Sequence, residues 1–186
     1  IVCGFILGVI AIVPLRIAGR LMEIYVQISV SLNYILTPYF SSIAIGDNDS
    51  VNKKFLISIN CATILSALIF LNIVFIGDWF LTLWLGDVPQ FTPEVVNLIA
   101  VGFCIATIQG PCTSFLISKD KNKTIMLLCI LEIVTLLSII YPFVSLFGIM
   151  GAAYSMAISL GLSRGILQPI IISRVLKISL LTYCVN

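Results

Sequence analysis

Two stretches of the chain, residues 55–77 and 95–118, contain no charged residue at all. A run of about 18 or more mostly apolar residues is long enough to cross a lipid bilayer as a helix. Over the whole chain, 60% of the residues are hydrophobic and only 10% are charged, whereas roughly a quarter of a soluble domain is charged. The sequence therefore predicts an integral membrane protein.

The other apolar runs complete a predicted all-α membrane protein of about six transmembrane helices. None of them shows the alternation of period two that marks a strand of a membrane barrel. Pro142 is expected to close the fifth span, and a short turn over residues 143–148 to follow it. The predicted spans are residues 1–14, 16–45, 55–77, 95–118, 124–141 and 149–172.

The chain begins at Ile1, inside an apolar run and without a preceding charged segment. A secretory signal peptide would carry such a segment before its apolar core. We therefore expect the chain to be the C-terminal part of a longer protein whose N-terminal part is missing.

Basic residues favour the cytoplasmic side of a membrane protein. Seven of the ten lysines and arginines lie in three segments, residues 53–54, 119–123 and 174–177, which alternate with segments that lack them. The expected topology places these segments and the C-terminus in the cytoplasm, and residues 78–94 outside. Trp79 and Trp84 in that outer segment are expected to anchor the chain at the bilayer interface.

Glu132 and Arg164 each lie inside an apolar span. A charge at bilayer depth costs about 2.5–3.5 kcal/mol on insertion scales, so such residues normally face a bundle interior or a wet cavity. Counted from the expected cytoplasmic ends of their helices, both lie about 12–14 Å deep. They could therefore form an ion pair between antiparallel neighbours, or each could face a different partner. If they do form an ion pair, the sequence leaves open whether the pair lines a transport path or has a structural role.

Six polar residues of the second predicted span follow spacings of three and four. Residues at these spacings share one face of a helix. An apolar face opposite them is expected around Ile24, Val26 and Ile28, and Glu23 is expected to hold Arg20 in place. Such a stripe either lines a water-filled cavity or forms a polar seam against other helices. The stripe consists of Arg16, Arg20, Glu23, Gln27, Ser31 and Tyr34.

Two further polar positions lie inside predicted spans. Gln109 precedes Gly110 and Pro111, and a proline there should break or kink the helix. Broken membrane helices often line cavities, although a kink used only for packing is an equal alternative. Gln168 lies one helical turn after Arg164 and should share its face.

Several classes of chemistry find no support in the sequence. Histidine is absent, and the six cysteines are scattered without a C-x-x-C pair, so we expect no metal site. No nucleotide-binding, hydrolase or metalloprotease motif occurs. We expect no enzyme activity, no catalytic residue, no cofactor and no nucleic-acid partner.

Five short segments, in their order and spacing, resemble the polysaccharide flippases of the multidrug/oligosaccharidyl-lipid/polysaccharide exporter superfamily. Ser118 stands before the fourth segment, where that family usually has glycine. The segments are residues 17–21 (IAGRL), 36–41 (LTPYFS), 83–86 (LWLG), 119–121 (KDK) and 148–153 (GIMGAA).

The resemblance implies that the chain is the C-terminal bundle of a two-bundle transporter in the bacterial cytoplasmic membrane. It implies transfer of an undecaprenyl-diphosphate-linked oligosaccharide to the outer leaflet, for surface polysaccharides such as O-antigen and lipopolysaccharide. Its partners would be this lipid-linked substrate, membrane lipids, the missing N-terminal bundle and the polysaccharide polymerase machinery. Arg16, Arg20 and Arg164 would then suit the diphosphate, and Glu23 and Glu132 would be candidates for ion coupling.

Three other functions stay open at this point. The first is a multidrug or cation antiporter of the same superfamily. The second is a membrane enzyme of polysaccharide assembly, a polymerase or ligase, although the short loops outside the membrane lack the arginine and histidine expected there. The third is a membrane scaffold that transports nothing.

Overall fold

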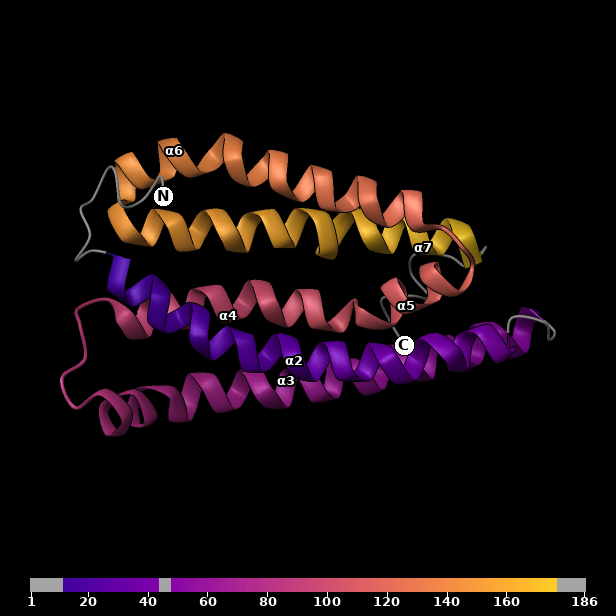
Figure 1. Cartoon of the computed structure of the whole chain (residues 1–186), viewed down its shortest axis with the longest axis horizontal. Helices are drawn as coiled ribbons and strands as arrows, with labels where there is room; N and C mark the ends of the chain where they lie inside the picture. The colour runs from indigo at the N-terminus through magenta and orange to yellow at the C-terminus, as the bar shows by residue number, and fades with distance from the viewer. Residues whose placement is uncertain (1–11, 44–47, 177–186) are drawn as a thin grey trace.

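The computed structural model describes residues 12–43 and 48–176, which form a bundle of long helices (Figure 1). No strand occurs in these two ranges, so the predicted all-α fold is confirmed for them. Most of the first predicted span, residues 1–14, lies outside the described residues. The helices are α2 (Val13–Ile43), α3 (Asn48–Leu85), α4 (Thr92–Ile108), α5 (Gly110–Ser118), α6 (Asn122–Leu160), the π-helix η2 (Gly161–Leu167) and α7 (Gln168–Leu176).

Helix α6 doubles back on itself at Gly148, whose φ of 59° and ψ of −136° are not helical. Figure 1 shows the two halves side by side. We call residues 122–147 the outgoing arm, and residues 149–176, which continue through η2 and α7, the return arm. Pro142 lies inside the outgoing arm and does not end it as predicted. The chain reverses at Gly148 rather than at Pro142, because glycine adopts a positive φ without a steric penalty.

Helix α3 is longer than the span predicted at residues 55–77. It continues to Leu85, so Trp79 and Trp84 lie on a helix rather than in a loop. No glycine with a positive φ or proline interrupts residues 78–85, and the helix ends where Gly86 takes a φ of 72°. A glycine of this conformation is a common helix terminator.

Two clusters of buried side chains hold α2, α3, α4 and α5 together. In the first, the rings of Phe40, Phe55 and Phe115 meet with centroids 5.3–6.0 Å apart. Aromatic pairs at such distances favour tilted and edge-on arrangements like those seen here. The second cluster, toward the start of α2, contains Ala18, Met22, Leu81, Val95, Val96, Ile99, Ala100 and Ala153.

Three helical stretches are long and apolar enough to cross a membrane: Val51–Leu85, Thr92–Ser118 and Asn122–Leu176. Large apolar side chains lie exposed along them, among them Ile64, Phe75 and Leu137. Lipid tails would cover such side chains in a bilayer, so these findings fit an all-α membrane protein. Helix α2 is not among the three stretches, and the total of about six spans stays a prediction.

Candidate functional site

The two charges inside the apolar spans meet in the middle of the bundle. Arg164 Nε lies 3.1 Å from Glu132 Oε2, so the ion pair predicted as one of two alternatives is present. The Arg164 side chain is 19% exposed and that of Glu132 is 26% exposed. The pair joins the outgoing arm to the return arm.

Serine hydroxyls strengthen this connection between the two arms. Ser163 Oγ donates to Glu132 Oε2 at 3.1 Å, and Ser159 Oγ donates to the Glu132 main-chain oxygen at 2.6 Å. Arg164 also places Nη2 3.7 Å from Cys129 Sγ on the outgoing arm. The carboxylate is therefore held by hydrogen bonds as well as by charge, which a partly buried ion needs.

A π-helical turn presents Arg164 to these partners. The turn η2 (Gly161–Leu167) lies between the α-helical parts of the return arm. One extra residue per turn changes the direction in which a side chain points, and such turns occur frequently at functional sites. No residue type or spacing in the sequence predicts this turn.

Hydrogen bonds of Gln168 connect Arg164 to the break in the fourth predicted span. Arg164 Nη1 donates to Gln168 Oε1 at 3.4 Å. Gln168 Nε2 donates to the Gln109 main-chain oxygen at 3.2 Å and to Thr113 Oγ1 at 3.0 Å. Gln168 is fully buried. The predicted break is confirmed, since Gln109 separates α4 from α5.

This interior network brings together four of the nine predicted site residues: Gln109, Glu132, Arg164 and Gln168. Ser159, Ser163 and Thr113 also belong to it, and the sequence reasoning missed them. The four-residue spacing of Ser159 and Ser163 beside Arg164 was the available signal. Each of the two charged members, Glu132 and Arg164, pairs with another member of the network. This pairing favours a structural role for the ion pair. A role in a transport path stays a prediction for these residues.

The other five predicted site residues lie on α2 and are exposed: Arg16, Arg20, Glu23, Gln27 and Tyr34. Arg20 Nη1 donates to Glu23 Oε2 at 2.9 Å, as predicted. We call these five residues and Ser31 the α2 stripe. Arg16 forms no ion pair with any described residue.

The α2 stripe points away from the bundle. Helix α2 packs on its neighbours through Ala18, Met22, Tyr25 and Phe40, which are at most 1% exposed. Ala18 and Gln27 are nine residues apart, which is half a turn out of phase in a helix of 3.6 residues per turn. The predicted apolar face around Ile24, Val26 and Ile28 is therefore wrong: these side chains are exposed and flank the stripe.

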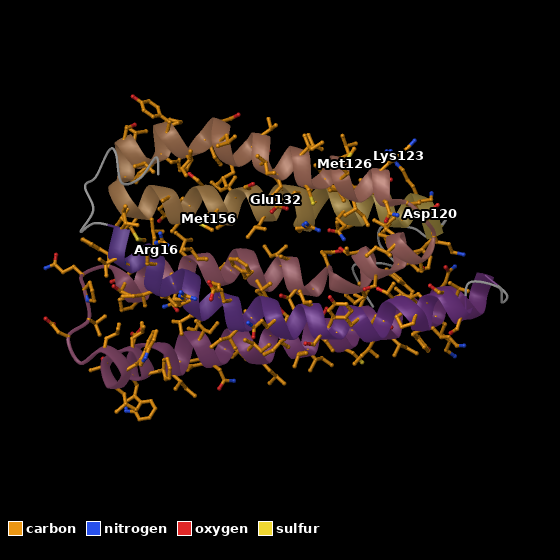
Figure 2. The ribbon with its side chains drawn as sticks, in the orientation of Figure 1. Arg16, Asp120, Lys123, Met126, Glu132 and Met156 are labelled. Carbon is orange, nitrogen blue, oxygen red and sulfur yellow. The ribbon has the colours of Figure 1, made fainter. Side chains whose placement is uncertain are left out.

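A groove of about 460 Å³ runs between α2, α4 and the two arms of α6. Its polar edge is formed by Glu23 and Gln27 of the α2 stripe. A smaller hollow of about 190 Å³ is lined in part by Glu132 and Ser159. Phe103 and Met156 line both spaces. In Figure 2, Met156 lies between Arg16 and Glu132 along the long axis of the bundle.

No protein-family model, no curated protein and no solved structure matches the chain. The resemblance to polysaccharide flippases therefore stays a prediction that depends on the sequence segments quoted above.

Proposed function

We propose that the chain is one helix bundle of a membrane transporter that moves an anionic, lipid-linked oligosaccharide between the leaflets of a bacterial cytoplasmic membrane. The observation that carries the proposal is the direction of the α2 stripe. Six polar side chains, two of them arginines, lie on the helix face opposite the face that packs into the bundle. In an apolar chain such a face needs water or a polar counterpart.

The charge of the α2 stripe favours an anionic cargo. Glu23 neutralises Arg20 within the stripe, whereas Arg16 has no carboxylate partner among the described residues. Arginine binds phosphate groups through two or more donors in a fixed plane, so a lipid diphosphate suits this position. A cation antiporter is less well supported, because Arg164 already pairs with Glu132, the carboxylate inside the bundle.

A flipping assay tests the proposal. The full-length protein is reconstituted in vesicles with a polyprenyl-diphosphate oligosaccharide that carries a fluorescent sugar, and a membrane-impermeant quencher reports its leaflet. We expect Arg16→Ala and Arg20→Ala each to slow flipping by roughly tenfold or more, because a hydrogen-bonded charge contributes about 1.5–3 kcal/mol. Each substitution removes contacts to the diphosphate and leaves the packing face of α2 unchanged.

Lys123→Ala serves as the matched control, because Lys123 is an exposed basic residue at the start of the outgoing arm, at the opposite end of the bundle from Arg16 (Figure 2). It should flip the substrate at the wild-type rate. Wild-type flipping by both arginine variants would contradict the proposal, and so would an equal loss in all three variants.

A further inference from the structure

The groove between α2, α4 and the two arms of α6 has walls that are almost entirely apolar. Apart from Glu23 and Gln27 at its edge, it is lined by side chains such as Met22, Ile99, Phe103 and Met156. Empty space of about 460 Å³ leaves its lining atoms without dispersion partners, so a packed protein normally fills it. In a bilayer the groove is therefore expected to hold an apolar occupant.

Gly19 contributes no side chain to this groove. It lies in the interior of α2 and lines the groove, although glycine in a helix is less stable than alanine by about 1 kcal/mol. A Cβ atom at Gly19 would meet nothing within 4 Å. Close packing between helices therefore does not explain the glycine, whereas space for an occupant does.

The length and volume of the groove indicate whether its occupant is a hydrocarbon chain or a helix. Its lining on α2 extends from Leu15 to Gln27, which corresponds to roughly 18 Å of helix. Spread over that length, the volume of about 460 Å³ gives a mean cross-section of roughly 25 Å². A helix with its side chains is about 10–12 Å wide and needs several times that area. A single hydrocarbon chain fits inside the groove, whereas a transmembrane helix could only lie across its open side.

Charge at the groove's end indicates which lipid supplies the chain. Arg16 follows Leu15, the first lining residue, and forms no ion pair with a described residue. Arg20 follows Gly19 and is shared with Glu23. A second groove of about 420 Å³, between α2 and α3, has no charged residue in its lining. Of these two grooves, only the one that Gly19 lines, which we call the Gly19 groove, has arginines next in sequence to its lining residues.

We propose that the Gly19 groove binds one acyl chain of an anionic phospholipid, whose phosphate lies at Arg16 and Arg20. Such binding does not depend on transport. If the chain also flips a lipid-linked substrate, the diphosphate of that substrate displaces the phospholipid phosphate from Arg16 and Arg20. The groove would hold a resident lipid as part of the folded bundle in the membrane.

Photolabelling of the full-length protein in vesicles tests this binding. The vesicles contain phosphatidylglycerol with a diazirine in one acyl chain, and mass spectrometry locates the adducts. We expect adducts on Met22, Phe103 or Met156. Gly19→Leu should lower them about tenfold, because its side chain occupies the same space as the lipid chain. Adducts in the second groove, which includes Tyr39 and Cys61, should not change.

Gly77→Leu is the matched control, since Gly77 is also a helical glycine but lies on α3 outside the groove. A Cβ there meets only the Ile73 side chain at 3.9 Å, an ordinary contact. This variant should label like the wild type. Equal labelling of the wild type and Gly19→Leu would overturn the proposal, and so would an equal loss in Gly77→Leu.

Two further arms test the identity of the lipid. Phosphatidylcholine carrying the same diazirine chain should label the groove about fivefold less, because one basic residue near the surface attracts an anionic lipid by about 1 kcal/mol. Arg16→Gln should remove that difference. Equal labelling by both lipids in the wild type would overturn the anionic assignment. Labelling of the groove by an equal amount of a polyprenyl phosphate with a diazirine in its chain, at least as strong as the labelling by phosphatidylglycerol, would overturn the choice of a phospholipid.

Discussion

Gly151→Ala is expected to lower the free energy of unfolding by at least about 3 kcal/mol, the upper part of the range for overpacked sites. A Cβ at Gly151 would overlap the main-chain carbonyl of Phe143 and approach Val144 N to 2.8 Å. These atoms belong to the backbone of the outgoing arm and cannot rotate away like a side chain. The substitution should therefore force apart the two arms where the chain reverses at Gly148.

An SDS titration of the micelle-solubilised protein, followed by circular dichroism, measures this loss. Gly161→Ala is the matched control on the same arm, since a Cβ there meets nothing within 4 Å. It should leave the stability unchanged or raise it by roughly 0.5–1 kcal/mol, the helix preference of alanine over glycine. Equal stabilities of the two variants would show that the close approach of Gly151 to the backbone of Phe143 and Val144 is not part of the fold.

Removing one member of the Glu132–Arg164 pair is expected to cost about 3 kcal/mol, because the remaining charge is left without its partner in a mostly apolar bundle. We therefore expect Glu132→Leu and Arg164→Leu each to lose about this much stability. The double variant should recover most of the loss, since apolar residues can replace a buried pair at little cost.

The double-mutant cycle uses the same SDS titration on four proteins. A coupling energy well above that of an exposed ion pair, which is about 0.2–1 kcal/mol, would support an interior connection between the arms. Strict additivity of the two single losses would contradict it. The pair would then contribute nothing that each residue does not contribute alone.

The sequence predicted those features that follow from spacing along one helix. The α2 stripe was visible at intervals of three and four residues, and the equal depth of Glu132 and Arg164 made an ion pair one of two alternatives. The break at Gln109 followed from the proline two residues later. Each of these predictions needs only helix geometry and the cost of placing a charge among apolar residues.

Features that depend on contacts between helices could not be predicted from the sequence. Apolar residues surround α2 on several sides, so hydrophobicity could not select Ala18, Met22 and Tyr25 as the packed face. Pro142 predicts a helix end, whereas the chain reverses at Gly148. No sequence pattern predicts the π-helical turn around Arg164. The hydrogen bonds from Ser159 and Ser163 to Glu132 depend on how the two arms pack against each other.

The transport proposal depends on the direction of the α2 stripe, and spin-label accessibility at Gln27 measures that direction most directly. A nitroxide is attached to Gln27→Cys or to Ile64→Cys in the full-length protein in bilayers, after the six native cysteines are replaced by alanine. Both side chains are exposed in this bundle. We expect the label at position 27 to collide with a water-soluble nickel complex and the label at position 64 with oxygen dissolved in lipid. If position 27 instead behaves like position 64, the stripe faces acyl chains and the transport proposal fails.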